Sequence, residues 1–277
     1  MSEFDPQNIF SLDGNRIVIT GGTGVLCGEI ALALVRAGAR VAVLGRHPEK
    51  ADKLLEQVRE MPGELIALRA DVLDRSSLEV AFRAVLEQLG GIDGLINGAG
   101  GNAPAATTSP DRSFFDILPD DFRAVSDVNL LGTVLPSQVF GKQMAEQGSG
   151  VIVNVSSMAS LRPLTRIFAY SAAKSGVNNF TRWLAVHMAR EYSPKIRVNA
   201  IAPGFFLTEQ NRFLLWDEEK SAWSERGQAI LDHTPAGRFG DPADLVGSIF
   251  WLLSPASSFV TGTVIPIDGG FSAFSGV

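Results

Sequence analysis

The sequence of 277 residues predicts one α/β domain, a doubly wound parallel sheet of about seven strands with helices on both faces. Short apolar runs alternate along the chain with helical stretches of about ten residues or more, as βαβ crossovers require. Runs such as Val151–Val155 carry no charge, which is typical of strands covered on both faces. No linker, repeat or composition shift divides the chain, so we expect residues 1–277 to form one domain with a substrate lid at about 205–235.

In the first half, β-branched runs predict the strands, and apolar residues at helical spacing predict the helices. Gly38 ends the first helix and Pro48 begins the second, while Leu78, Phe82 and Val85 share one face of the third. The predicted elements are strands Arg16–Thr20, Arg40–Leu44, Leu65–Leu68 and Ile92–Asn97, and helices Gly24–Ala37, Pro48–Glu60 and Arg75–Leu89.

The second half continues the alternation after a loop-rich stretch at 102–110. Pro203 and Gly204 end the sixth strand, and Trp216 and Trp223 fall in a segment that we interpret as a helix. The predicted elements are helices Pro119–Gln147, Phe168–Tyr192, Thr208–Leu231 and Pro242–Leu253, and strands Gly150–Ser156, Lys195–Ile201 and Thr263–Ile267. Ligands of open α/β sheets bind at the carboxyl ends of the strands, so we expect the functional site there.

The charge balance argues against a nucleic-acid or membrane-surface partner. The chain has 24 Lys and Arg against 30 Asp and Glu, a net charge of −6, and no basic cluster. The charge-free stretch Leu245–Ile267 could resemble a membrane span, but Ser254 and Pro255 interrupt it, which favours a helix, a turn and a strand. The first residues are acidic and lack the long apolar run of a signal peptide.

The content of cysteine and histidine argues against a metal or disulfide framework. The single cysteine, Cys27, excludes an intramolecular disulfide and a cysteine-rich zinc site, and it fits a reducing cytoplasm, where we expect the protein to reside. The three histidines, His47, His187 and His233, show no metal-ligand spacing, so we expect no metal.

A glycine-rich segment, Thr20–Gly28 (TGGTGVLCG), joins the first strand to its helix. Glycines there let the backbone approach a pyrophosphate, and the helix N-terminus offers free N–H groups and a partial positive charge. Gly45 and Arg46 follow the second strand, where an acid would select NAD and an arginine can accommodate the 2′-phosphate of NADP. We therefore expect NADP(H) to be favoured, with NAD(H) as the alternative; a solvated surface charge is the competing interpretation of Arg46.

Tyr170 and Lys174 lie four residues apart on a predicted helix, so their side chains share one face. A neighbouring ammonium lowers the pKa of a phenol, which can then exchange a proton with a substrate oxygen. This spacing is common in helices that have no catalytic role. Ser157, at the end of the fifth strand, adds a hydroxyl that could hydrogen-bond a reacting carbonyl in the same pocket.

In this order and spacing, the motifs resemble those of the short-chain dehydrogenase/reductase family over nearly the whole length. The resemblance is carried by TGGTG at 20–24, Asp71-Val72, Asn97-Gly98-Ala99-Gly100, Asn129, Ser157, Tyr170 with Lys174, Asn199, Pro203-Gly204 with Thr208, and Ile267-Asp268-Gly269-Gly270.

The resemblance implies roles for four catalytic residues. Tyr170 would be the general acid/base, Lys174 would lower its pKa and hold the nicotinamide ribose, Ser157 would orient the substrate carbonyl, and Asn129 would anchor a water. Together with Arg46, the expected cofactor residues are Gly21, Thr23, Gly24, Leu26, Asp71, Val72, Asn97, Ala99, Tyr170, Lys174, Pro203, Gly204 and Thr208.

Three features depart from the family pattern. Val25 and Cys27 stand where the pattern TGxxxGxG has glycine, so the first helix could start differently. Gly98 replaces the usual second asparagine, and the loop at 102–118 is longer than the family pattern.

A narrower resemblance, within this family, points to the D-mannonate oxidoreductases (fructuronate reductases). It is carried by NGAGGN at 97–102, SSMASLRPLTR at 156–166, APGFFLTEQNRFLL at 202–215 and IDGGFSAFSGV at 267–277. It implies reduction of a keto-uronate, D-fructuronate, to D-mannonate. Arg162, Arg166 and Arg212 could hold the substrate carboxylate, although each could instead be a solvated or ion-paired surface charge.

Two other functions remain open: a reductase of another carbonyl, such as a ketogluconate or a 3-oxoacyl thioester, and a dinucleotide-sensing module without turnover. Such a module would more often lose Tyr170 or Lys174. The family resemblance also implies a homotetramer, built on the helices at 119–147 and 168–192 and on the tail at 271–277.

Overall fold

The computed structural model describes residues 8–208, 212–218 and 220–276. A seven-stranded sheet forms the centre, with the order β3-β2-β1-β4-β5-β6-β9, and every neighbouring pair is parallel. The strands are β1 (Arg16–Thr20), β2 (Arg40–Gly45), β3 (Glu64–Arg69), β4 (Gly94–Asn97), β5 (Gly150–Val155), β6 (Ile196–Pro203) and β9 (Val264–Ile267). The order reverses between β1 and β4, so the predicted doubly wound sheet is confirmed.

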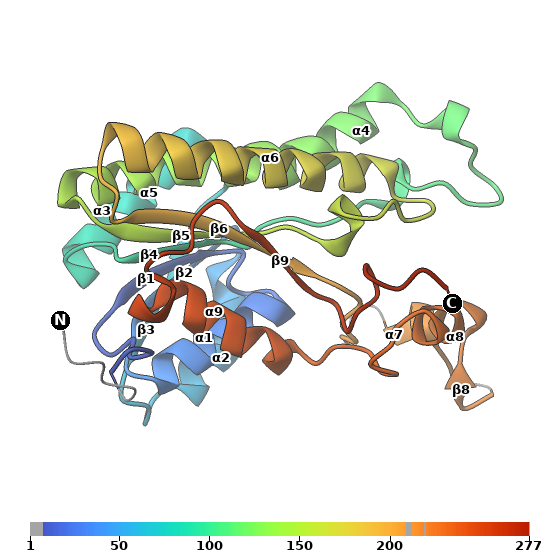
Figure 1. Ribbon diagram of the computed structural model, residues 1–277, viewed down its shortest axis with the longest axis horizontal. Helices are drawn as coiled ribbons and strands as arrows, with labels where there is room; N and C mark the ends of the chain where they lie inside the picture. The colour runs from blue at the N-terminus through green and yellow to red at the C-terminus, as the bar shows by residue number, and fades with distance from the viewer. Residues whose placement is uncertain (1–7, 209–211, 219, 277) are drawn as a thin grey trace.

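Helices cover both faces of the sheet (Figure 1). One layer contains α3 (Arg75–Leu89), α5 (Gly132–Gln147) and α6 (Phe168–Glu191), and the other contains α1 (Val25–Arg36), α2 (Asp52–Gln57) and α9 (Val246–Leu253). Each layer buries its own apolar cluster against the sheet: Ile30, Leu34 and Ile249 lie in one, and Leu78, Phe140 and Ile152 in the other. These buried faces hold the strand ends in fixed positions.

Local sequence explains where the helices begin and end. The Asp74 carboxylate accepts hydrogen bonds from the N–H groups of Ser76 and Ser77, and Gly90 ends α3 in the left-handed conformation. The predicted helix at 48–60 is a 3-10 turn, Pro48–Ala51, followed by α2, and the predicted helix at 242–253 is likewise a 3-10 turn, Pro242–Leu245, followed by α9. Prolines begin both 3-10 turns.

The helix predicted over 119–147 is confirmed at both bounds, but it contains an internal π-helical turn that the sequence pattern does not predict. The segment consists of α4 (Pro119–Ser126), a π-helical turn (Asp127–Leu131) and α5. The Asn129 side-chain amide donates to the carbonyl oxygen of Val125, so a side chain takes an acceptor that an α-helix would give to the backbone.

The single helix predicted over 208–231 is wrong in the described part of that segment, which leaves out residues 209–211 and 219. It contains α7 (Arg212–Leu215), an antiparallel pair of β7 (Trp216–Asp217) and β8 (Ala222–Trp223), and α8 (Glu225–Asp232). The Trp216 and Trp223 rings meet edge to face across this pair, with centroids 5.0 Å apart. The segment lies next to the C-terminal tail, at the right of Figure 1.

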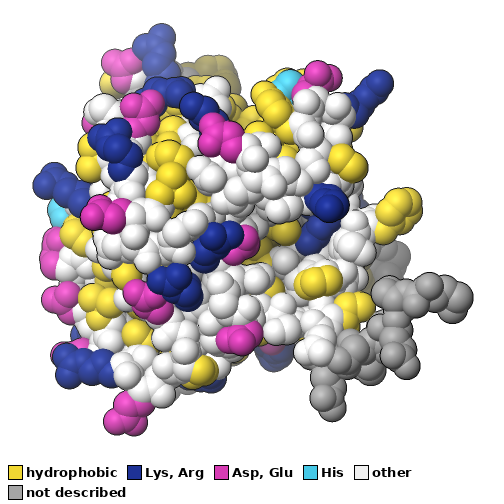
Figure 2. Space-filling view, turned by 90° about the vertical axis from the view of Figure 1, so that its left-hand side faces the viewer, with side chains coloured by type: hydrophobic (Ala, Val, Ile, Leu, Met, Phe, Trp, Pro, Cys, Tyr) yellow, Lys and Arg dark blue, Asp and Glu magenta, His cyan; other side chains and the backbone are white. Residues whose placement is uncertain are grey.

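The end of the molecule away from α7 and α8 carries mixed charge. Figure 2 shows Lys and Arg side chains interspersed with Asp and Glu on this face, without a continuous basic patch. Among the described residues, we find no helix with the length and apolar content needed to cross a membrane.

Candidate active site

Ser157, Tyr170 and Lys174 converge where β5 ends and α6 begins. Ser157 follows β5 and caps a short 3-10 turn, Met158–Ser160, by accepting a hydrogen bond from the Ala159 N–H (3.2 Å). Its hydroxyl also hydrogen-bonds the Tyr170 hydroxyl. Lys174 lies one helical turn after Tyr170, with its Nζ 5.7 Å from the centre of the tyrosine ring. The structure thus brings together the three groups that the sequence spacing predicts to meet.

Burial sets the protonation of Lys174. The side chain is 4% exposed, and its Nζ donates a 2.7 Å hydrogen bond to the Val155 carbonyl oxygen at the end of β5. Burial disfavours the charged form and lowers the pKa of Lys174 to about 8. No acidic side chain among the described residues pairs with it. The ammonium is therefore held at a fixed place, and its charge is costly there.

Burial also raises the pKa of Tyr170, because it disfavours the phenolate, and the hydrogen bond from Ser157 offsets only part of that effect. The shift is opposite to the one expected from the Tyr170–Lys174 spacing. The lysine Nζ makes its hydrogen bond to Val155 rather than to the phenol oxygen, and it is itself desolvated. In this arrangement, Tyr170 is thus protonated at neutral pH.

A buried hydrogen-bond network fixes β5 against α6. The Ser156 hydroxyl donates to Asn178 Oδ1 (2.6 Å), and Asn178 Nδ2 donates to the Ser160 hydroxyl (2.7 Å). Sequence reasoning missed Asn178 as a supporting residue. Its position four residues after Lys174, on the same helix face, was the available signal.

Asn129 is buried in the π-helical turn and faces the loop after β4. Its Oδ1 accepts from the Gly101 N–H (3.1 Å), and its Nδ2 donates to the Gly101 carbonyl oxygen (2.6 Å). Gly100 lies between Asn129 and Lys174: a Cβ there would be 2.6 Å from Asn129 Oδ1 and 3.2 Å from Lys174 Nζ. The missing side chain at position 100 therefore keeps a space open between the amide and the ammonium.

The structure places Asn97 in the interior of the sheet. Its Nδ2 donates to the Ser137 hydroxyl (2.9 Å) and to Asn154 Oδ1 (2.8 Å), and Asn154 in turn donates to Thr181 on α6. These contacts tie β4 to β5 and to α5. The role expected for Asn97 along the cofactor stays a prediction.

A groove of about 440 Å³ crosses the carboxyl ends of β1, β2, β3 and β4. Its lining includes these predicted cofactor residues: Gly21, Thr23, Gly24, Leu26, Arg46, Asp71, Val72 and Ala99. Gly21 has a φ of 67°, and a Cβ there would be 2.8 Å from the Ala99 backbone, so glycine is required where two loops meet.

The start of α1 suits the phosphates of a dinucleotide. Gly24 is the N-cap and provides no side-chain hydrogen bond to the helix, and the first turn contains no acidic residue. The N–H groups and the positive end of the helix dipole therefore face the groove without a competing carboxylate. The residues present thus fit a dinucleotide cofactor, even though Val25 and Cys27 replace two glycines of the family pattern.

The Cys27 side chain occupies the space next to Gly98. The cysteine is buried and lies against Gly98, where an added Cβ would overlap the Cys27 sulfur. The sulfur thus takes up volume that a larger residue at 98 would need. Burial raises the pKa of Cys27 to about 11, so the thiol is protonated and serves as an apolar filler.

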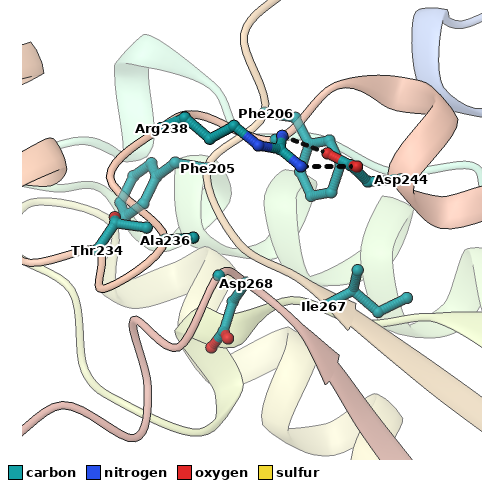
Figure 3. A pocket seen from close by; sticks show the side chains of 10 residues that line it. Phe205, Phe206, Thr234, Ala236, Arg238, Asp244, Ile267 and Asp268 are labelled. Atoms are coloured by element: carbon teal, nitrogen blue, oxygen red, sulfur yellow. Dashed lines mark hydrogen bonds and ion pairs between the residues drawn. The ribbon is translucent and has the colours of Figure 1, made fainter.

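The segment after β6 is pinned to two neighbouring loops. The Gly204 N–H donates to the Ile267 carbonyl oxygen (2.9 Å), and Phe206 forms a parallel bridge with Gly240. Figure 3 shows the resulting cavity of about 280 Å³, with Phe205 and Thr234 on one side and Ile267 on another. The Arg238 guanidinium pairs through both terminal nitrogens with Asp244, at 2.7 and 2.9 Å, at the edge of this cavity.

The ion pair between Arg238 and Asp244 was not predicted from the sequence. Hydrogen bonds from Arg238 and from the Asp241 N–H lower the pKa of Asp244 to about 2. Pro203, Gly204 and Thr208 belong to the neighbouring segment, which is hydrogen-bonded to Gly240 and Ile267. Their expected contact with the nicotinamide stays a prediction.

The three predicted substrate arginines lie in different surroundings. Arg162 Nε donates to the Ser272 carbonyl oxygen (2.9 Å) and lines a cavity of about 660 Å³ beside the tail. Arg166 has an unusual φ of 74° and lines a neighbouring open cavity. Arg212 pairs with Glu218 (3.3 Å) and lies over the Trp216 ring, 5.4 Å from its centre. Arg226, on α8, lines both cavities and was missed, because the segment was predicted as part of one long helix.

Within the described ranges, we find no group of three or more His, Cys, Asp or Glu residues that could hold a metal ion. The candidate site thus consists of Ser157 after β5, Tyr170 and Lys174 on α6, and a groove that fits a dinucleotide.

Known proteins share both the sequence and the fold. A family model of short-chain dehydrogenases matches residues 15–219. The uncharacterized oxidoreductase UxuB of Bacillus subtilis (strain 168) is 47% identical over 276 residues, which cover 96% of this chain and 98% of that protein. A solved structure of a provisionally assigned D-mannonate oxidoreductase of Haemophilus influenzae, with bound NAD, matches with a TM-score of 0.90 and 40% identity, over 98% of this chain and 100% of that chain.

A second solved structure, a gluconate 5-dehydrogenase of Burkholderia cenocepacia, contains NADP and tartrate. It matches with a TM-score of 0.84 and 32% identity, over 98% of this chain and 100% of that chain. Similar proteins thus bind either dinucleotide, and the NAD in the Haemophilus influenzae structure does not support the preference for NADP expected from Arg46.

Proposed function

Because this chain belongs to the short-chain dehydrogenase/reductase family and is an NAD(P)-dependent oxidoreductase, we propose that it interconverts a keto sugar acid and its hydroxy acid, with D-fructuronate and D-mannonate as the pair. One observation carries the proposal: the Ser157–Tyr170 hydrogen bond lies one helical turn from a buried Lys174. The name of the Haemophilus influenzae protein supports the choice of substrate.

In reduction, the hydroxyls of Ser157 and Tyr170 donate hydrogen bonds to the substrate carbonyl oxygen. The nicotinamide, when bound, supplies the hydride that the carbonyl carbon accepts. Tyr170 then gives its proton to the oxygen. Its raised pKa keeps it protonated before this step, so it starts as an acid, and oxidation of the alcohol runs the same transfers in reverse.

Lys174 and Asn129 support the proton transfer. The Lys174 ammonium stabilises the tyrosinate left behind, because it is fixed near the ring and little water screens it. The space beside Gly100 lets a water lie between Asn129 Oδ1 and Lys174 Nζ and return a proton to the site. When the cofactor is bound, Lys174 also holds its nicotinamide ribose.

We propose that Arg46 gives NADP(H) an advantage over NAD(H). Gly45 leaves no carboxylate at the end of β2 to repel a 2′-phosphate, and Arg46 and Lys50 both line the groove. The relative that binds NAD is the contrary observation. Comparison of kcat/KM for NADPH and NADH decides between the two cofactors.

We propose a homotetramer in the cytoplasm as the assembled form. Trp183 and Val186 on α6, and Tyr192 directly after it, are 57–59% exposed, which is unusual for large apolar side chains. Trp183 and Tyr192 line a groove beside α5 and α6, in which Trp183 stacks on His187 with ring centroids 4.8 Å apart. A second copy would cover this face.

The test is the Tyr170→Phe variant, assayed with D-fructuronate, a 5-ketogluconate and a 3-oxoacyl thioester. Loss of the acidic hydroxyl should lower kcat by about 10²–10⁴-fold, while the dissociation constant of the cofactor stays within a factor of about three. Near-normal turnover in this variant would end the assignment of Tyr170. Preferred turnover of a substrate without a carboxylate would end the assignment of the substrate, and the absence of turnover in the wild type would favour a dinucleotide-sensing module.

A further inference from the structure

The cavity beside the catalytic turn has walls from four parts of the chain. Arg162 comes from the loop after Ser157, Phe205 from the segment after β6, Arg226 and His233 from α8 and its end, and Phe271 and Phe274 from the tail. Its volume is about 660 Å³. The tail and α8 lie side by side in Figure 1, and His233 meets Phe271 edge to face with centroids 4.8 Å apart.

The titratable side chains that line this cavity are all basic. Two arginines and a histidine line it, and among the residues that the structure describes, none of those that line it is acidic. The cavity is open to solvent and Arg162 is exposed, but its remaining walls are largely apolar, with Ile230 and the three phenylalanines, so water screens an anion against these walls less than on an open surface. The two arginines would attract a carboxylate more strongly there than on an open surface.

Arg226 differs from Arg162 and Arg212, whose guanidinium groups each have a hydrogen-bond or ion-pair partner. It is half-buried, yet no hydrogen bond or ion pair to another described residue holds its guanidinium. Burial lowers its pKa, and the nearby charge of Arg166 lowers it further. Arg166 likewise has no described carboxylate partner, and its backbone holds the uncommon left-handed conformation while its carbonyl oxygen accepts from the Thr108 N–H (3.0 Å).

Arg212 lacks these properties. Its guanidinium pairs with Glu218 and lies over Trp216, and it does not line the cavity. A carboxylate bound by Arg212 would have to displace an existing partner, whereas one bound by Arg226 would displace no described partner and would offset its repulsion from Arg166.

We propose that Arg226, assisted by Arg162, binds the carboxylate of the sugar-acid substrate and so selects hydroxy acids over neutral polyols. The proposal rests on the proposed function, because it takes the cavity as the place of the substrate's far end. A guanidinium can hold both carboxylate oxygens at once, and α8 would be fixed over the site by the ligand rather than by a protein acid.

The test measures binding, not turnover. The full-length protein, saturated with reduced cofactor, is titrated calorimetrically with D-mannonate and with D-mannitol, a neutral polyol of the same length that cannot be reduced further. The wild type should bind D-mannonate at least about tenfold more tightly than D-mannitol. Arg226→Gln should abolish this preference, and Arg226→Lys should retain part of it.

Two variants serve as controls. Arg212→Gln should bind D-mannonate as the wild type does, and so should Arg59→Gln, which removes an exposed charge after α2. Cofactor affinity measured on each variant verifies that the fold is intact. If Arg226→Gln keeps the wild-type preference, or if Arg212→Gln alone loses it, the proposal is overturned.

The outcomes separate this inference from the proposed function. If the wild type reduces D-fructuronate but its KM is unchanged in Arg226→Gln, the function stands and the inference fails. If the wild type does not reduce D-fructuronate, yet its D-mannonate binding depends on Arg226, the inference stands and that substrate pair fails.

Discussion

At the scale of single residues, Gly100 leaves a space between the Asn129 amide and the Lys174 ammonium that a larger side chain would fill. Gly100→Ala should lower kcat by about 10–100-fold, because its Cβ would lie 2.6 Å from Asn129 Oδ1 and push it or Lys174 from its place. Gly101→Ala is the matched control, since an added Cβ there meets no atom within 4 Å. Steady-state kinetics on both variants measure the effect, and equal kcat values would show that the space has no role.

Substitutions at Cys27 and Gly98 should have coupled effects on stability, because the Cys27 sulfur fills the volume that the missing side chain of Gly98 leaves free. Both residues depart from the family pattern. Gly98→Ala in the wild type should lower the free energy of unfolding by about 2–3 kcal/mol through overlap with the Cys27 sulfur. In a Cys27→Ala background the same change should cost about 1 kcal/mol less, and the remainder comes from the Thr20 carbonyl oxygen, 3.0 Å from the new Cβ. Urea unfolding of the four proteins gives the cycle; costs that simply add would refute the coupling.

At the scale of elements, the sequence predicts what local interactions decide. The bounds of α3 are predicted at both ends, because Asp74 caps it and Gly90 ends it. The pair of β7 and β8 could not be predicted, because the contact of Trp216 with Trp223 joins residues seven positions apart, which also suits two turns of a helix. The π-helical turn contains a side-chain hydrogen bond from Asn129 to the Val125 carbonyl oxygen, which periodicity does not reveal.

The exposed face of α6 allows a prediction about assembly. Trp183→Glu should shift the protein to a species of lower mass, because a charge would be buried without a partner in the proposed contact between copies. Val80→Glu is the control, since Val80 is similarly exposed (58%) but lies on α3. Sedimentation velocity measures the masses. A wild type that is already monomeric, or a Trp183→Glu protein of unchanged mass, would contradict the proposed interface.

At the scale of the whole molecule, the strand order brings together residues that are far apart in sequence. The order of motifs predicts this meeting, because most of the motifs directly follow a strand and the seven parallel strands end at the same edge of the sheet. The place of Arg226 in the site could not be predicted, because Arg226 does not follow a strand of the sheet. Its position depends on how α8 packs against the tail, through contacts such as those between His233, Phe271 and Phe274, and no local pattern encodes them.

Folding buries the Lys174 ammonium between α6 and the end of β5, so the stability of the protein should depend on pH. The pKa of Lys174 falls from 10.5 in the unfolded protein to about 8 in the folded one, so between these values the unfolded state binds the extra proton and the free energy of unfolding rises with pH. From pH 7 to pH 9.5 this contribution should grow by about 2 kcal/mol. Urea unfolding without cofactor, at one protein concentration, measures it against Lys174→Met, which lacks the titrating group. If the difference between the two proteins is the same at both pH values, burial does not desolvate the lysine as the structure indicates.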